Sequence, residues 1–345
     1  APVPPAASAP GPGAPAPWVS AAAATTGAAA TAATAADTAE GEQRDVGKRK
    51  FALPRWAKWA GTVVGLAVVF GLVVLFARWL VGTGPVADFI ERYPGRAPTP
   101  ESTPVGFPAW LNWAHFFNIF FMALIVRTGL QIRSERRAPA YWTPHWDHKR
   151  KISITLWLHL CVDLAWILNG IVFIVLLFTT GQWMRIVPTS WEVLPNAVSA
   201  GLQYLTLDWP TEHAWVHYNG LQQIFYFLTV FVAAPLAIAT GFRMSGWWSM
   251  RWKRASKIYP LTVARAVHFP VMIYFCVFTV VHVGLVLTTG VIANLNGMFA
   301  AQDSTGWLGP VLFVVAMVVT AGATLAARPM LLAPAARLMG RVTAR

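Results

Sequence analysis

Four of the eight histidines in this 345-residue chain lie within long apolar stretches. Ionisable side chains at membrane depth are rare and are functional candidates by default. Imidazole nitrogens bind transition metals and transfer protons near neutral pH. The first candidates for chemistry are therefore His115, His159, His268 and His282.

The spacing of two of these histidines places them on one face of a single helix. His268 and His282 are 14 residues apart, which corresponds to about 21 Å of helical rise and nearly four turns. One helix would therefore present two imidazoles in roughly the same direction, one near each face of a membrane.

Six apolar stretches are long enough to cross a bilayer, which takes roughly 20 apolar residues. The chain is 56% hydrophobic and only 12% charged, about half the charge of an average soluble domain. We therefore expect an all-α membrane protein with six transmembrane helices. The expected spans are residues 59–77, 110–130, 152–178, 221–242, 261–289 and 307–327.

Lysine and arginine are unevenly distributed between the two sides of this arrangement. If the N-terminus lies in the cytoplasm, 23 of the 27 basic residues fall on the cytoplasmic side and 4 on the external side. The positive-inside rule then predicts that both termini are cytoplasmic. This distribution also accounts for the net charge of +13 without a nucleic-acid partner.

In this topology the four histidines form two pairs at matched depths. His115 and His282 lie near the external side, whereas His159 and His268 lie near the cytoplasmic side. Facing imidazoles on different helices are what the two axial positions of a haem iron require. With both positions filled the iron has no open site for oxygen, so the predicted chemistry is electron transfer.

Several sequence stretches accompany the interval between His268 and His282. They are NWAHFFN at 112–118, LWLH at 156–159, YNGLQQIFY at 218–226, APL at 234–236 and Thr240-Gly241. Together they resemble the bacterial cytochrome b561 superfamily, which includes formate dehydrogenase gamma and thiosulfate reductase cytochrome b subunits. The resemblance covers residues 105–290 and implies a four-helix di-haem core formed by the second to fifth spans.

The resemblance implies two b-type haems, each bound by one histidine pair, and a quinone site. It also implies a catalytic oxidoreductase subunit, with molybdopterin or iron–sulfur clusters, as partner in the bacterial plasma membrane. The chain would then be an electron-transfer subunit of a respiratory enzyme. The helix at 56–80 and the segment 305–345, a sixth span with a basic cytoplasmic tail, are additional to that core.

Two charged residues near the cytoplasmic pair are candidates for supporting roles. Asp163 is one turn after His159 on the same helix face, where it would orient that ring, take up protons from a quinol or pair with a neighbouring helix. Arg265 lies three residues before His268. It would hold a haem propionate, anchor the helix at the cytoplasmic face, or both.

Two other features each leave two interpretations open. Glycines in or near the core helices would permit either close approach of a flat macrocycle or ordinary helix packing. Apolar residues at helical spacing over 193–205 predict a short interfacial helix, which would cap the bundle or line a quinone pocket. The glycines are Gly129, Gly170, Gly241, Gly284 and Gly290.

The remaining histidines carry weaker signals. His145 and His148 are expected at the surface of a basic loop. His213 and His217 form at most a metal half-site, because a metal bound by protein alone needs further ligands.

Residues 1–47 are rich in alanine, proline, threonine and glycine, and they predict a disordered tail. No nucleophile or phosphate-binding motif is present, so no catalytic residue is assigned. Two alternative functions remain. One is a proton-coupled transporter or channel that uses the membrane histidines, and the other is a cofactor-free anchor for a partner enzyme.

Overall fold

The computed structural model describes residues 54–209, 214–248 and 252–344. The predicted tail at 1–47 lies outside the described residues, as does His213. By its internal contacts the chain divides into two units, residues 1–64 and 65–345, with the boundary inside the first helix. All packing described below lies within residues 65–345.

Helices make up most of the described chain, and three short strands complete it. In chain order the elements are α1 Arg55–Val81, α2 Gly84–Arg92, α3 Ala109–Ser134, β1 Ala140–Pro144, β2 Ile152–Ser153, α4 Ile154–Thr179, the 3-10 helix η1 Gln182–Arg185, α5 Val193–Leu205, α6 Gly220–Phe227, the π-helix η2 Leu228–Ala233, α7 Ala234–Met244, α8 Lys253–Ile258, α9 Leu261–Thr288, α10 Val291–Leu295, the π-helix η3 Asn296–Ala300, α11 Leu308–Ala326, α12 Pro329–Arg337 and β3 Gly340–Ala344.

Six helical segments are long and apolar enough to cross a membrane, and each coincides with a predicted span. Their outward faces carry large exposed apolar side chains, such as Leu168, Val280 and Val314. A soluble monomer rarely exposes so much contiguous apolar surface. These helices therefore support a multi-pass membrane protein in a lipid bilayer. The segments are Arg55–Val81, Ala109–Ser134, Ile154–Thr179, Gly220–Met244, Leu261–Thr288 and Leu308–Ala326.

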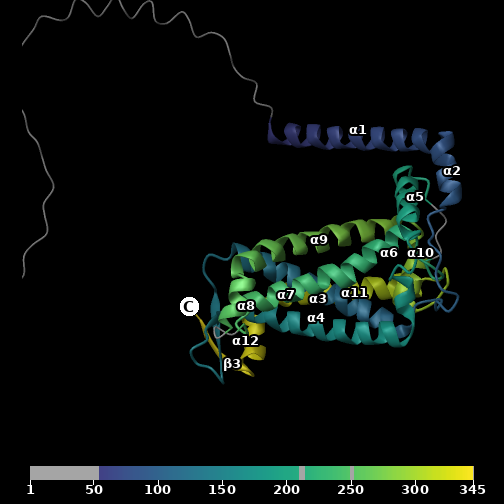
Figure 1. Ribbon diagram of the computed structural model, residues 1–345. Coiled ribbons are helices and arrows are strands. Elements are labelled where there is room, and N and C mark those ends of the chain that lie inside the picture. Colours follow the sequence, from purple (N-terminus) through teal and green to yellow (C-terminus); the bar gives the residue numbers. More distant parts are fainter. Residues whose placement is uncertain (1–53, 210–213, 249–251, 345) are drawn as a thin grey trace, which may run out of the picture. The chain divides into compact units, whose positions relative to one another are not determined.

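Five of these segments run alongside one another within residues 65–345 (Figure 1). Helix α3 packs against α4 and α11, and α7 packs against α9. Aromatic contacts join the two groups, because Trp166 of α4 meets Phe275 of α9 edge-on at 6.2 Å. We call the end of this bundle that carries the three strands the sheet end, and the end that carries η1 and α5 the η1 end.

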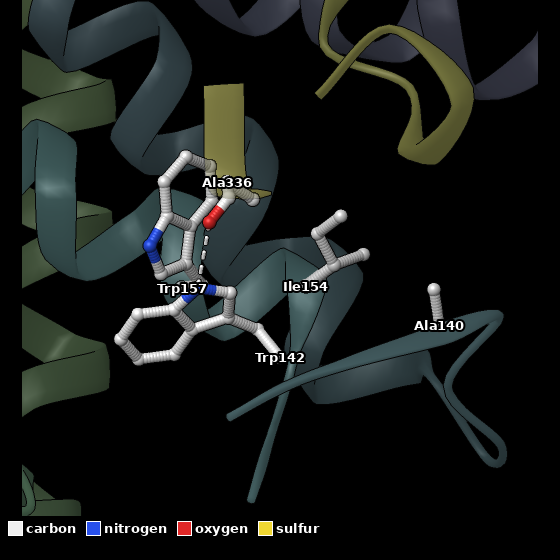
Figure 2. Packing of buried hydrophobic residues seen from close by; sticks show 5 residues of the cluster. All are labelled: Ala140, Trp142, Ile154, Trp157 and Ala336. Carbon is white, nitrogen blue, oxygen red and sulfur yellow. Dashed lines mark hydrogen bonds between the residues drawn. The ribbon is translucent and has the colours of Figure 1, made fainter. Parts of the chain in front are cut away.

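The sheet end departs from the all-α expectation. Strands β2, β1 and β3 form a small antiparallel sheet in that order. Trp142 of β1 donates its indole N–H to the carbonyl oxygen of Ala336 at 2.9 Å and packs beside Ile154 and Trp157 (Figure 2). Residue 140 pairs with residue 344, and no local sequence pattern could predict a pairing across that separation.

The third span also begins later than expected. Residues 152 and 153 belong to β2, and the Ser153 hydroxyl caps α4 by accepting from the Leu156 N–H at 3.1 Å. A serine cap satisfies one of the N–H groups that a helix start leaves without a partner. This cap fixes the residue at which α4 begins, and therefore the position of His159 along that helix.

The fourth span is interrupted next to Pro235. The π-helix η2 lies between α6 and α7, immediately before Ala234 and Pro235. Proline has no N–H to donate to the preceding turn, so the helical hydrogen-bond ladder must change register there. Thr229 within η2 lies 2.9 Å from the Tyr274 hydroxyl, which ties the π turn to α9.

The predicted interfacial helix is confirmed as α5 at the η1 end. It packs on the start of α6 at Gly220, where an added Cβ would lie 2.8 Å from the backbone nitrogen of Ala197. The glycine therefore permits direct contact between the two helix backbones. The capping role and the quinone-pocket role of this helix both remain predictions.

A single buried asparagine fixes the start of α11. Asn296 is fully buried, and its amide oxygen accepts the Gly309 N–H at 2.9 Å. Its amide nitrogen donates to the carbonyl oxygens of Ile292 and Gly306. Gly309 lies directly against the backbone of Leu295 and Asn296, closer than any Cβ could approach.

We expect Gly309→Ala to destabilise the protein by about 1–3 kcal/mol, because the new methyl group must push η3 and α11 apart. Gly322→Ala is the matched control on the same helix, since a Cβ there would meet nothing within 4 Å. Thermal unfolding of both variants in detergent measures the difference. Equal melting temperatures for the two variants would contradict this packing.

Candidate functional site

The structure brings His115 of α3 and His282 of α9 together at the η1 end. Their ring centroids are 6.3 Å apart, and the ring planes are inclined by 62°. Two imidazoles that share one metal ion from opposite sides, with bonds of about 2.0–2.1 Å, would place their centroids roughly 6 Å apart. The observed spacing therefore fits a shared metal ion.

Aromatic rings surround this pair on three elements. Phe278 stacks on His282 at 5.6 Å, and Tyr226 of α6 meets the same ring edge-on at 6.2 Å. Phe299 of η3 lies 6.0 Å from the His115 ring. Such walls exclude water and strengthen the electrostatic interactions inside them.

One nitrogen of this pair lacks a partner within the described residues. The Nδ1 atom of His115 is buried and makes no hydrogen bond. A buried polar atom without a partner is costly, and in native proteins it indicates a ligand, an ion or a water molecule. The polar surroundings of the His115 ring are therefore incomplete within the described residues.

At the sheet end, a threonine on the neighbouring helix sets the tautomer of His159. The Thr128 hydroxyl lies 2.7 Å from both the Leu124 carbonyl oxygen and the His159 Nδ1 atom. A hydroxyl has one hydrogen, and the carbonyl can only accept. With the hydroxyl hydrogen directed at the carbonyl oxygen, we assign the ring nitrogen as the donor to Thr128, which leaves the lone pair on Nε2.

His268 is held in the same way from α7. The Thr240 hydroxyl lies 2.6 Å from the Leu236 carbonyl oxygen and 2.8 Å from the His268 Nδ1 atom. Metal-binding histidines almost always donate their second ring N–H to such an acceptor. His159 and His268 also lie close enough to interact electrostatically, and in both rings this arrangement leaves the lone pair on Nε2.

Asp163 does not occupy the position that a second-shell partner of His159 would take. Its carboxylate lies 3.7 Å from Nε2, whereas Nδ1 is occupied by Thr128. The Thr128 hydroxyl, and not the Asp163 carboxylate, therefore lies beside the Nδ1 atom, and the roles expected of Asp163 remain predictions. Asp163 remains beside the imidazole within its own helix, with 27% of its side chain exposed.

Arg265 lies on α9, three residues before His268, and it is exposed. His145 and His148 are also exposed, as expected for the basic loop. The propionate-binding and anchoring roles of Arg265 both remain predictions.

The five glycines singled out in the sequence do not form close backbone contacts between helices. A Cβ at Gly129 would lie 3.4 Å from the His159 ring, and one at Gly241 would lie 3.6 Å from the His268 ring. A Cβ at each of the other three would meet nothing within 4 Å. Close helix packing is instead the role of Gly220 and Gly309, whereas Gly129 and Gly241 each lie against an imidazole ring.

Within the part of the chain that the structure describes, no group of three or more His, Cys, Asp or Glu side chains could hold a metal ion. The two pairs therefore do not suit zinc bound by protein alone, which needs three or four protein ligands. An iron porphyrin needs only axial ligands from the protein. The donor sets fit that group.

Sequence reasoning missed the two threonines that orient His159 and His268. The available signal was a repeated dipeptide, because Thr128-Gly129 and Thr240-Gly241 place a hydroxyl and a gap beside one imidazole each. A hydroxyl that also bonds to its own helix backbone looks like an ordinary helical threonine from sequence alone.

Comparisons with known proteins add no family assignment. No family model, curated protein or solved structure matches this chain. The function must therefore be argued from the two histidine pairs.

We expect Thr128→Val to destabilise the protein by about 1–3 kcal/mol, because it leaves the buried Nδ1–H of His159 without an acceptor. Thr128→Ser should retain most of the stability. Thr320→Val is the matched control, since its buried hydroxyl donates only to the Ala316 carbonyl oxygen. Thermal unfolding that ranks Thr320→Val as the more damaging change would contradict the tautomer assignment.

Proposed function

We propose that this chain is a membrane electron-transfer subunit that binds two b-type haems, one between His115 and His282 and one between His159 and His268. The 6.3 Å separation of the His115 and His282 ring centroids carries the proposal. Haem iron with two imidazole ligands supplies one-electron transfer and has no open position for oxygen.

The residues around each pair hold the imidazoles ready for a metal. At the sheet end, Thr128 and Thr240 fix Nδ1 as the protonated nitrogen, so Nε2 is free to bind iron. At the η1 end, the ring of Phe278 holds His282 by stacking, with planes inclined by only 5°. Ligands fixed in advance lose little conformational entropy on binding.

Aromatic side chains fill the space along α9 between the two levels. Tyr274 and Phe275 lie in contact at 5.9 Å, and Tyr274 stacks on Phe278 at 6.3 Å. Trp166 reaches Phe275 from α4 and donates to the Asn118 side chain at 2.7 Å. This packed, dry layer would keep two haems apart and at fixed positions.

Quinone and a partner oxidoreductase complete the proposal. A lipid-soluble quinone reaches the apolar outward faces of the bundle directly, and a peripheral catalytic subunit binds at one of its polar ends. Asp163 is the only acidic residue within the six apolar helices. In this proposal it exchanges protons when quinone is reduced or quinol is oxidised.

The chief competing function is a proton-coupled transporter. The π turn at η2 favours it to some degree, because transporters bind substrates at interrupted helices. However, the Thr229 hydroxyl in this turn is hydrogen-bonded to Phe225 and lies 2.9 Å from the Tyr274 hydroxyl. The interruption is therefore tied to its neighbours, and the electron-transfer function remains the better supported.

Reduced-minus-oxidised spectroscopy of the purified protein tests the proposal. We expect a b-type spectrum and a pyridine haemochrome stoichiometry of two haems per chain. His282→Ala and His268→Ala should each remove one haem and spare the other, because the pairs lie at different levels of the bundle. His145→Ala, in an exposed loop, is the control and should keep both haems.

A colourless protein from a haem-replete host would refute electron transfer, and proton-coupled uptake by that protein would establish the transporter instead. Loss of both haems in a folded His282→Ala protein would also contradict the assignment of separate pairs.

A further inference from the structure

Arg185 is a deeply buried charge at the η1 end, with 3% of the residue exposed. Its guanidinium donates to the carbonyl oxygen of Gly106 at 2.6 Å and to that of Ala214. It also lies over the rings of Phe107 and Tyr218, at 4.8 and 4.7 Å from their centroids. Arginine is almost never buried to this degree without a partner of opposite charge.

None of these four partners carries a negative charge. Among the described residues, no carboxylate is found paired with Arg185. The Nε–H of Arg185 has no acceptor among the described residues. Burial lowers the pKa of Arg185 and nearby tyrosines oppose that change, yet a guanidinium remains protonated at neutral pH.

The fold places this uncompensated cation beside the His115–His282 pair. Tyr218, under the guanidinium, meets Tyr226 at 4.9 Å, and Tyr226 meets the His282 ring at 6.2 Å. The segment is held rigidly, because the Gly106 N–H donates to the Trp215 carbonyl oxygen at 2.8 Å. Gly106 has φ +89 and touches the Trp215 ring, so no side chain fits there.

Other buried polar atoms without partners lie at the start of α3 and in η1. Within the described residues they include the indole nitrogen of Trp110, the amide oxygens of Asn112 and Gln182 and the Nδ1 atom of His115. All belong to the first turns of α3 or to η1. Of these atoms the indole nitrogen of Trp110 is a donor without an acceptor, which an anionic ligand would satisfy, whereas the two amide oxygens are acceptors.

We propose that Arg185 is the counter-ion of a carboxylate carried by the haem between His115 and His282. This inference rests on the proposed function. Haem propionates are carboxylates at the edge of an apolar macrocycle, and the guanidinium fork matches a carboxylate in shape and charge. The indole N–H of Trp110 is a second donor for the same group.

Two other groups could be the partner of Arg185, and the experiment distinguishes each of them from a haem carboxylate. Glu212, two residues before Ala214, lies outside the described residues, and it would be an internal counter-ion. A quinone headgroup would accept hydrogen bonds from the same guanidinium. Redox titration of quinone-depleted protein excludes the quinone headgroup, and Glu212→Gln tests the internal counter-ion, because loss of that carboxylate would leave Arg185 unpaired.

The test compares Arg185→Gln with the parent full-length protein. We expect the midpoint potential of the haem assigned to His282 to fall and that of the other haem to stay unchanged. The positive charge stabilises the electron-rich reduced haem, and its removal favours the oxidised form. Arg185→Lys keeps the charge, so its potential should stay near that of the parent.

Arg78→Gln is the matched control. Arg78 is exposed, is placed on the same membrane side by the predicted topology, and also donates to a backbone carbonyl, that of Thr206 at 2.8 Å. Its removal should leave both potentials unchanged. Glu212→Gln should likewise have no effect on them.

Intact haem content with an unshifted potential in Arg185→Gln would overturn this inference and leave the proposed function standing. The inference would also be overturned if Glu212→Gln lost as much stability as Arg185→Gln. The same holds if the shift in haem potential appeared only when quinone is present. If Arg185→Gln does not fold, the deciding measurement is the rate at which Arg185→Lys loses haem to an excess of a haem-binding acceptor protein. We expect faster loss than from the parent, because lysine cannot make the bidentate contact. An unchanged rate would refute the role of Arg185. Absence of haem from the parent protein would instead end the proposed function.

Discussion

A hydrocarbon layer offers no hydrogen-bond partner, so every polar group inside a membrane bundle must be satisfied by the chain or by something bound to it. This constraint organises the bundle around its histidines. Thr128 and Thr240 each satisfy one ring nitrogen while remaining bonded to their own helix backbone. The other nitrogen of each ring is left facing the bundle interior, where a metal ion is its natural partner.

The two ends of the bundle meet this constraint differently. At the sheet end, protein groups satisfy the Nδ1 atoms, and Asp163 lies 3.7 Å from the remaining His159 nitrogen. At the η1 end, several buried atoms of α3 and η1 have no partner in the described residues, and Arg185 is buried there without a carboxylate partner among them. In our account that difference gives the two haems different electrostatic surroundings, which is how a protein sets the direction of electron flow between like cofactors.

Much of this arrangement could be predicted from sequence, because it follows from local patterns. Apolar length predicts the six spans, helical spacing predicts α5, and depth matching across the topology predicts that His115 meets His282. The sheet was missed because its strands are far apart in the chain. Arg185 was missed because counting charges by side gives no information on burial. The contacts of Thr128 and Thr240 with the imidazoles depend on side-chain geometry between helices. The repeated Thr-Gly dipeptide was the only signal of these contacts in the sequence.

Low-temperature electron paramagnetic resonance of the oxidised, purified protein tests the central claim most directly, because the signal reports the axial ligands of the iron. Our account predicts two low-spin ferric signals typical of bis-imidazole haem, one of which disappears in the His282→Ala protein. A high-spin signal as the main species in the parent protein, or the absence of any haem signal, would contradict it.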